Sequence, residues 1–318
     1  INLAIDAAYA AGGGVVYVPA GTWPCTTQIV LKANVTLAGD GPASHLDFSS
    51  AGAITTCIKA AGSLAETSVA FSATITKGAT TITFPSAPSG VAAGTPLLIY
   101  DSDDGGFNAA RDEYRAGEWC KVKSVSGGTV TLDGPVFSTY STGGTRTIYV
   151  VTPVTAQVRN LRATFKAGLT GIEFELGHKC LAVDLDLSGS DTSCLTFDRC
   201  FEVSAERVKA FDVSASIGLN YGVIISNSQR VIVDGCHLDT TRHGLAVGGS
   251  DKVTSASSPT EGRAISSTWA PAWRKLASAR SKARDTAGSS ASSITVVGTA
   301  RRRALTGRLV RPTRRCAR

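Results

Sequence analysis

Apolar positions recur with a fixed period between residues 155 and 250. One series opens apolar–any–apolar triplets at intervals of 24, 26 and 25 residues, at Leu161, Leu185, Phe211 and Cys236. A second series begins short alternating runs inside the same units, at Ile172, Leu195, Val223 and Leu245. A repeat of this length, built from short alternating strands and polar corners, is typical of a solenoid. Because almost no room is left for helices, we expect the strands to stack in parallel, as in a β-helix.

The same alternation also suits a β-sandwich with evenly spaced strands. The hairpins of a sandwich need tight Asn-Gly or Asp-Gly turns at most junctions, and this region has only Asp234-Gly235. Two registers that repeat together favour the solenoid. We therefore predict an all-β chain that forms a parallel β-helix, with its repeating turns in residues 151–250.

The first 66 residues are interpreted as a cap and the first coils of the solenoid. Residues 3–11 have the pattern of a short amphipathic helix, which the glycines at 12–14 end. Strands are expected to follow from Val15, Ile29 and Val35. The open end of a β-helix exposes unpaired backbone and apolar side chains, so we expect the helix to cover it.

Residues 67–150 break the period. Alternating strands are expected at 69–75 and 80–84 and a buried strand at 97–100, and a Gly-Gly hairpin follows near residue 127. We interpret this segment as an inserted β subdomain. Asp101, Asp103 and Asp104 lack the frame and the distal Glu of a calcium loop, which favours a solvated loop.

The repeat is expected to end at residue 250. Residues 251–318 hold 15 Lys and Arg against 3 Asp and Glu, a net charge of +12, whereas the first 250 residues hold 17 against 22, a net charge of −5, so the basic character of the chain lies in the tail. The tail is interpreted as a basic arm, as a disordered segment, or as a frame slip rather than the natural continuation. The slightly acidic body gives no reason to expect a nucleic-acid partner, and no stretch has the length of a membrane span.

The cysteines are expected to be free and inward-facing. They show neither Cys-x-x-Cys spacing nor an accompanying His cluster, so we expect no metal site and no cofactor. Cys180, Cys194, Cys200 and Cys236 fall on the predicted turns, where free cysteine is a suitable small core residue. The chain contains no Met and starts like the inside of a folded element, which indicates a fragment or a processed chain.

Outward carboxylates on adjacent turns are the first candidates for chemistry. Neighbouring strands lie about 4.8 Å apart, so such carboxylates can reach the separations of about 5–9.5 Å that glycosidases use. Asp186 and Asp212 flank equivalent inward positions one turn apart and are predicted to face one groove. A solvated acidic face is the alternative. The other outward candidates are Arg162, Asp184, His237, Glu173, Glu175, Thr196 and Asp198.

The opening of the chain resembles the pectate-lyase-like superfamily of right-handed β-helix proteins. The matching stretches are residues 4–8, 13–21 and 35–41, and the stretch Tyr114-x-x-Gly-Glu118 is similar to the insertion of phage-type members. This superfamily includes secreted polysaccharide lyases and hydrolases and the tailspikes and depolymerases of bacteriophages. The resemblance implies an extracellular or virion-associated protein with a polysaccharide partner. It also implies a homotrimer as a candidate assembly, because tailspike-like members usually form trimers.

Residues 241–250 resemble the coil of polygalacturonases that carries their Gly-His-Gly active-site histidine. The match is Thr-Arg-His-Gly-Leu, which makes Arg242 and His243 candidate catalytic residues. A histidine can act as general acid or base near neutral pH, and here it could equally cap a corner of the coil. The family's catalytic Asp pair corresponds to Asn220 and Tyr221 in this chain.

Together these patterns predict a carbohydrate-active β-helix that binds an acidic or cell-surface polysaccharide, with cleavage as a lyase or a glycoside hydrolase left open as a candidate activity. The candidate catalytic residues are His243, Arg242, Asp186 and Asp212. A non-catalytic tailspike shaft or surface adhesin is the alternative. Neither a nucleic acid nor a membrane is an expected partner.

Overall fold

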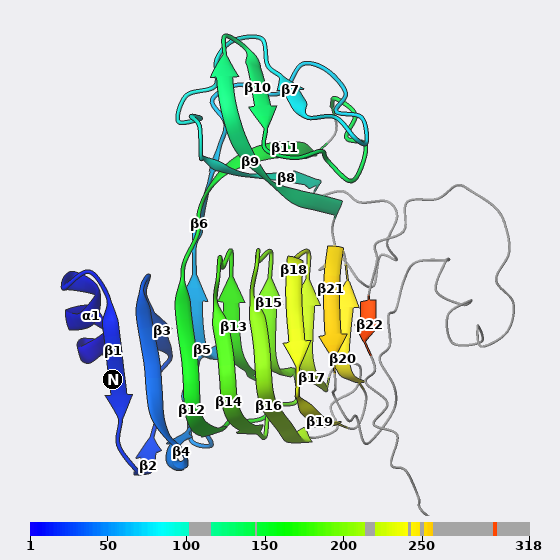
Figure 1. Cartoon of the computed structure of the whole chain (residues 1–318). Coiled ribbons are helices and arrows are strands. Elements are labelled where there is room, and N and C mark those ends of the chain that lie inside the picture. Colours follow the sequence, from blue (N-terminus) through cyan, green and yellow to red (C-terminus); the bar gives the residue numbers. More distant parts are fainter. Residues whose placement is uncertain are drawn as a thin grey trace, which may run out of the picture.

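The computed structural model describes residues 1–101, 116–143, 145–213, 220–240, 243–248, 251–256 and 295–297. In these ranges the chain coils into a right-handed parallel β-helix, and a separate antiparallel sheet projects from it (Figure 1). The fold class expected from the repeat is confirmed. No helix in these ranges is both long and apolar enough to cross a bilayer.

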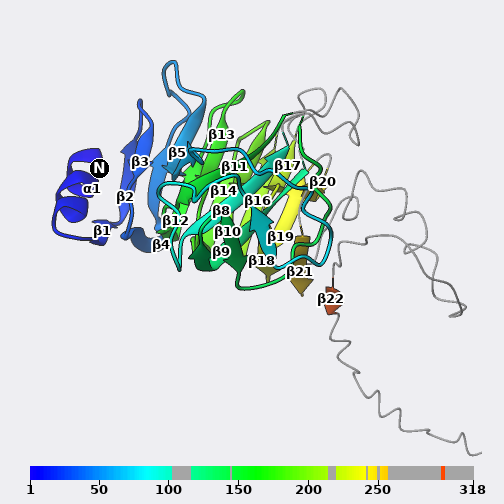
Figure 2. The same ribbon diagram turned by 90° about the horizontal axis from the view of Figure 1, so that it is seen from above.

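Two parallel sheets form the body of the solenoid. The first sheet contains β1 (Gly14–Val18), β2 (Gly21–Pro24), β4 (Val35–Asp47), β12 (Ala156–Thr164), β14 (Leu181–Ser188), β16 (Ser204–Val213), β18 (Gln229–Asp234), β19 (His237–Thr240), β21 (Asp251–Ala256) and β22 (Thr295–Val297). The second contains β3 (Ile29–Leu31), β5 (Thr56–Ala61), β13 (Thr170–Glu175), β15 (Ser193–Asp198), β17 (Tyr221–Ser226) and β20 (His243–Gly248). Seen from above in Figure 2, both sheets extend away from the helix α1 (Asn2–Ala10).

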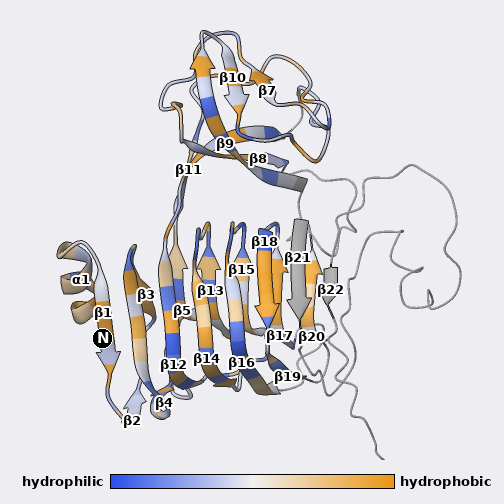
Figure 3. Cartoon of the chain, in the orientation of Figure 1, coloured by the Kyte–Doolittle hydropathy of each residue, from blue (hydrophilic) through white to orange (hydrophobic). Residues whose placement is uncertain are grey.

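Buried and more exposed positions alternate along strands such as β12, and hydrophobic and hydrophilic residues follow one another along the strands in Figure 3. The second apolar series forms one continuous inward column. Ile172 pairs with Leu195, Leu195 with Val223, and Val223 with Leu245. Ile58 on β5 extends the column upstream. None of these five side chains is more than 3% exposed, so the predicted register of this series is confirmed.

The first apolar series is correct at its start and wrong at its third member. Leu161 pairs with Leu185, as predicted. Leu185 then pairs with Val208, while Phe211 lies opposite Ser188, three residues further along the strands. Alternation could not settle this register, because residues 208–213 hold an apolar pair in each of the two phases.

A backbone bend fixes the register instead. Asn160, Asp184 and Arg207 all have a left-handed backbone, with φ of 53°, 53° and 51°. The pairing on either side of each bend stacks these three residues on successive turns. Non-glycine residues rarely adopt a left-handed backbone, and they do so only where the surrounding structure enforces it. The stacking of these three bends therefore determines which residues of neighbouring strands lie opposite each other.

The helix α1 closes the N-terminal end of the solenoid, as predicted. Ile5 is fully buried in the core, and the chain leaves the helix through Gly13, whose φ is 126°. A Cβ at Gly13 would meet the carbonyl oxygen of Asn34 at 2.6 Å. A glycine is therefore required where the cap joins β1.

The inserted segment forms an antiparallel sheet with its own core. Its strands are β6 (Ser63–Glu66), β7 (Thr81–Thr83), β8 (Pro96–Asp101), β9 (Ala116–Ser126), β10 (Thr129–Leu132) and β11 (Arg146–Thr152). Phe71, Ile82 and Val130 are among the buried residues of this core. A separate cluster joins the insertion to the solenoid through Leu98, Trp119, Val151 and Leu176.

The parallel ladder continues beyond residue 250, where the sequence predicted its end. β21 pairs with β18, with Val231 opposite Val253, and β22 pairs with β21. The strand at 251–256 is short and mainly polar, so its periodicity is too weak to be read without the preceding turn. The rest of the predicted tail lies outside the described residues.

The inward cysteines are buried free thiols, as expected. Cys180, Cys194, Cys200 and Cys236 are at most 1% exposed. Burial raises the pKa of Cys236 to about 11 and that of Cys194 to about 12. These side chains therefore act as small apolar core residues.

Candidate functional site

The structure places the predicted site residues on different sheets. Asp186 lies on β14 of the first sheet, whereas His243 opens β20 of the second sheet and packs against Tyr221 with 5.7 Å between ring centroids. Arg242 lies outside the described residues. Asp212 belongs to β16, and its side chain is not described. The catalytic roles of these four residues remain predictions.

The predicted pairing of Asp186 with Asp212 is wrong. Asp186 lies between Arg162 on β12 and Lys209 on β16, and its carboxylate is 3.1 Å from the Lys209 ammonium. The reason is the three-residue shift that also displaced Phe211. We call Arg162, Asp186 and Lys209 the strand-face column, because they alternate in charge along the outer face of the first sheet.

The outward carboxylates of the second sheet also have cationic partners. Lys59 lies 3.3 Å from Glu173 and 2.8 Å from Glu175, and Arg199 pairs with both Glu175 and Asp198. Burial raises the pKa of Asp198, and the adjacent Arg199 offsets only part of that effect. For Glu175, burial alone would raise the pKa, but Lys59 and Arg199 together bring it below its ordinary value. This network ties neighbouring turns together.

The corners that leave the second sheet carry another set of stacked side chains. His178, Phe201 and Gln229 bridge one another on successive turns. The residues that follow them, Lys179, Glu202 and Arg230, all have a left-handed backbone, with φ of 57°, 54° and 54°. We call Lys179, Glu202 and Arg230 the corner column. It also alternates in charge.

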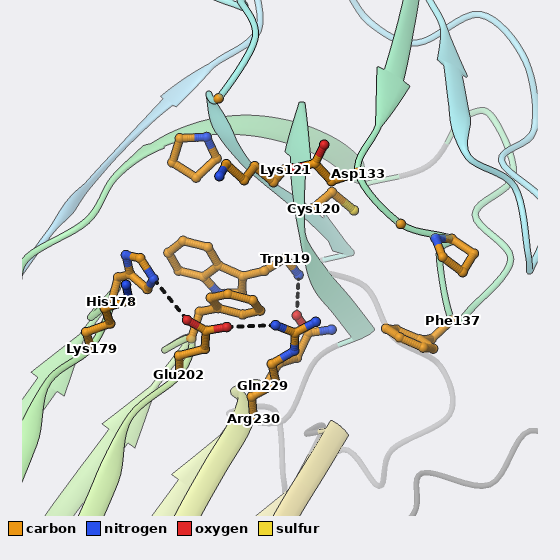
Figure 4. A pocket seen from close by; sticks show the side chains of 15 residues that line it. Trp119, Cys120, Lys121, Asp133, Phe137, His178, Lys179, Glu202, Gln229 and Arg230 are labelled. Carbon is orange, nitrogen blue, oxygen red and sulfur yellow. Dashed lines mark hydrogen bonds and ion pairs between the residues drawn. The ribbon is translucent and has the colours of Figure 1, made fainter. Parts of the chain in front are cut away.

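A cavity of about 720 Å³ lies between these corners and the insertion (Figure 4). Its solenoid side is formed by the two stacked sets just described. On the insertion side its lining includes Trp119, Lys121, Asp133 and Phe137. The volume is within the usual range for small-molecule sites, about 300–1,000 Å³.

Aromatic stacking holds the insertion against the corners. The rings of Trp119 and Phe201 are nearly parallel, with centroids 5.8 Å apart, and the indole N–H donates to the carbonyl of Arg199 at 3.1 Å. The side-chain oxygen of Gln229 accepts the main-chain N–H of Trp119 at 2.8 Å. The guanidinium of Arg230 lies 5.1 Å from the Phe201 ring centre, a cation–π distance. These contacts fix the width of the cavity.

Glu118 positions another part of the cavity wall. It is 1% exposed and accepts the main-chain N–H groups of Phe137 and Ser138 at 2.8–3.2 Å. The Glu of the Tyr-x-x-Gly-Glu stretch thus holds the loop that carries Phe137.

Glu202 is the best-connected charged group in the cavity. It accepts a hydrogen bond from Arg230 at 2.7 Å and lies 3.5 Å from the Nε2 atom of His178 (Figure 4). Burial alone would raise the pKa of Glu202, but Arg230 and His178 hold it below the ordinary value. At neutral pH the group is therefore a carboxylate, suited to accept a hydrogen bond or a proton rather than to act as a general acid.

Reasoning from the sequence missed this cavity, although one signal pointed to its solenoid half. Adding six to Ile172, Leu195 and Val223 gives His178, Phe201 and Gln229. Adding seven to the same three residue numbers gives Lys179, Glu202 and Arg230, the corner column. No such signal exists for the insertion side, because nothing in the sequence shows where the inserted sheet docks.

Comparison with protein families matches two parts of the chain. Residues 59–151 match the model of the tailspike protein-like Ig-like domain. Residues 188–270 match the model of Gp49, a pectin lyase-like domain. No curated protein matches the chain.

Solved structures of phage tailspikes have the same fold. Tailspike gp61 of Pseudomonas phage phi297 has 29% identity and a TM-score of 0.72, covering 84% of this chain and 46% of the tailspike. Tailspike gp49 of Pseudomonas phage LKA1 has 25% identity and a TM-score of 0.69, with 81% and 44% covered. Tailspike Gp54 of Acinetobacter baumannii bacteriophage AP22, solved with a capsular saccharide, has 21% identity and a TM-score of 0.68, with 81% and 43% covered.

The chain spans less than half the length of these tailspikes. Within that span the two family models fall on the two parts that enclose the cavity, the inserted sheet and the later turns of the solenoid. The chain therefore shares the β-helix fold of these phage tailspikes, with residues 59–151 similar to the tailspike Ig-like domain and residues 188–270 similar to the pectin lyase-like domain of Gp49.

Proposed function

We propose that this chain is the saccharide-binding part of a tailspike and that the cavity between the Ig-like insertion and the solenoid corners is a binding site for a surface polysaccharide. One observation carries the proposal. The cavity combines aromatic rings with charged and amide side chains, held at fixed width by the contacts of Trp119 with Phe201, Arg199 and Gln229. Polysaccharide ligands need such a mixture, because their apolar ring faces alternate with polar edges.

The comparisons support the same class of ligand. The AP22 tailspike, which shares the fold, holds a capsular saccharide in its solved structure. By the same reasoning we propose an extracellular, virion-associated location and a homotrimer as the assembly. We also propose residues 1–66, 67–150 and 151–250 as units of the chain, with the solenoid unit extended from 250 to Ala256 and the predicted tail of 251–318 shortened accordingly.

The test is a titration of the purified protein with a panel of capsular and other surface polysaccharides. Trp119 borders the cavity and Trp23 lies 41% exposed on β2, so the two tryptophans serve as matched probes. Binding should change the tryptophan fluorescence of the wild type and of Trp23→Phe, and much less that of Trp119→Phe. If no polymer of a broad panel binds, the proposed function is wrong.

Cleavage is a separate question and distinguishes an enzyme from an adhesin. New reducing ends after incubation would indicate a hydrolase, and absorbance from an unsaturated uronate would indicate a lyase. The candidate residues remain His243, Arg242, Asp186 and Asp212, and the cavity adds Glu202 and His178. Binding with neither product would support the non-catalytic alternative.

A further inference from the structure

We infer that the outer face of the first sheet carries a contact surface for a second copy of this chain, which lies alongside it and parallel to it. The inference rests on the assembly proposed above, because it names the surface through which the copies meet. The register of six neighbouring strands carries it, since that register aligns uncharged outward side chains along the solenoid.

The surface follows from the strand order β1, β4, β12, β14, β16 and β18 (Figure 1). The pairing of these strands stacks one outward residue from each of them in a single row. We call this row the uncharged stripe, and its members are Val15, Thr36, Gln157, Leu181, Ser204 and Ile232. At about 4.8 Å per turn, the row extends about 24 Å along the solenoid. The residues that follow it in sequence point inward, and Leu37, Val158 and Val233 among them are fully buried.

The stripe leaves apolar surface uncovered at both of its ends. Val15 is 56% exposed and Ile232 is 49% exposed, and Tyr17, beside Val15 on β1, is 55% exposed. Between these ends the stripe has hydroxyl, amide and leucine side chains and no formal charge. Such a surface can be buried without desolvating a charge, and the cores of protein interfaces are depleted of charged residues.

Charged rows flank the stripe on both sides. The corner column lies two residues before it, and its two cations and one carboxylate give a net charge of +1. Arg159, Glu206 and Asp234 lie two residues after it on β12, β16 and β18, and their net charge is −1. An uncharged centre between charged edges is the usual anatomy of a protein–protein interface.

Repeat and charge favour a second copy as the occupant. The stripe repeats once per turn, and another copy supplies a surface with the same repeat, which matches it turn by turn. Rotation about an axis parallel to the solenoid places the early edge of one stripe against the late edge of the other. The edge with a net charge of +1 then meets the edge with a net charge of −1. Identical stripes around such an axis form a closed assembly, as a homotrimer requires.

The experiment measures the molar mass of the purified chain by sedimentation equilibrium. The wild type should form an assembly whose mass is a multiple of that of one chain. The double variant Val15→Asp/Ile232→Asp should raise the dissociation constant about 100-fold or more, because the added carboxylates of parallel copies lie at the same height. Val30→Asp is the matched control, since Val30 is 44% exposed on β3 of the second sheet, and it should assemble like the wild type.

Gln157→Arg is a second variant, which adds a charge at the middle of the stripe and removes no apolar side chain. It should weaken assembly about 10-fold. Circular dichroism monitors the fold of each variant, and Gln157→Arg alone decides where the double variant is unfolded.

The inference is overturned if the folded stripe variants keep the wild-type mass, or if Val30→Asp dissociates the assembly as strongly. It is also overturned if the stripe variants lose polysaccharide binding without a change in mass, because the saccharide would then occupy the stripe. A wild type that binds a surface polysaccharide as a monomer would overturn the inference and leave the proposed saccharide-binding function standing.

Discussion

The strand-face column and the corner column have the same charge order, positive–negative–positive, on successive turns of one solenoid. The two columns differ in the surface that faces them. The strand-face column, Arg162–Asp186–Lys209, projects from the outer face of the first sheet. The corner column, Lys179–Glu202–Arg230, faces the insertion across the cavity. The same stacked charges therefore have different roles according to the surface that they meet.

The backbone explains why only the corners could acquire this role. On a strand, the side chains of neighbouring turns stand about 4.8 Å apart, and in the strand-face column Lys209 forms an ion pair with Asp186 on the next turn. At the corners, a left-handed residue on each turn directs the chain out of the sheet. The insertion faces these residues across the cavity, so the row of charges forms one wall of it.

The largest expected effect comes from removing the contact that closes the cavity. Trp119 is 7% exposed and stacks on Phe201, whereas Phe137 lines the same cavity at 37% exposure. Trp119→Ala should lower the free energy of unfolding by about 3–5 kcal/mol, the range for truncating a buried large aromatic residue. Phe137→Ala should lower it by about 0.5 kcal/mol, as for exposed residues. Denaturant unfolding of both variants measures the difference.

Equal losses for the two variants would mean that the insertion does not depend on Trp119 for its docking. In that case the cavity would be a loose contact between two parts of the chain. A loss confined to Trp119→Ala, together with loss of saccharide binding, would support the contrast between the two columns.

Removing the carboxylate of each column should affect the affinity for saccharide differently in the two columns. Glu202→Gln breaks the ion pair with Arg230 in the cavity wall, so the affinity for the polysaccharide that the wild type binds should change about 3–10-fold. Asp186→Asn makes the same change in the strand-face column, away from the cavity, and should alter binding by less than about 2-fold. Calorimetric titration of both variants with that polysaccharide tests this. A larger effect of Asp186→Asn would place the ligand on the first sheet.

The sequence predicted the solenoid well because its inward positions repeat. Ile172, Leu195 and Val223 must fill one core, and stacking allows them little freedom. The prediction from the sequence failed at Phe211. Two alternating apolar patterns overlap there, and the left-handed bend at Arg207 determines which of them faces the core. Local sequence does not signal that bend, since an arginine rarely adopts a positive φ.

Only the solenoid wall of the cavity could be predicted from the sequence. Its solenoid wall follows from the second apolar series, extended by six and seven residues to the corners. Its other wall depends on how a separate antiparallel sheet docks, through contacts such as Trp119 with Gln229, which are 110 positions apart in the chain. Such long-range contacts do not appear as a repeat in the sequence. The sequence-based search considered only carboxylates on strands and therefore missed the cavity beside the insertion.

The smallest expected effect is on the pH dependence of stability. Glu202 has a folded-state pKa below its ordinary value of 4.5, because its bonds with Arg230 and His178 outweigh its burial. The unfolded chain therefore takes up this proton at a higher pH than the folded chain. The stabilisation is present above about pH 4.5 and is lost as the pH falls through the folded-state pKa.

Glu202→Gln should accordingly cost about 1 kcal/mol or less near pH 7, as expected for a partly exposed pair. The difference from the wild type should shrink as the pH falls below about 4.5. Asp184, paired with Arg207 beside the strand-face column, has a lowered pKa for the same kind of reason and provides the control Asp184→Asn. Denaturation midpoints between pH 3 and 7 measure both. Because Asp184 is more exposed than Glu202, its curve should be the flatter one, and the reverse order would mean that the insertion does not shield the corner column from solvent.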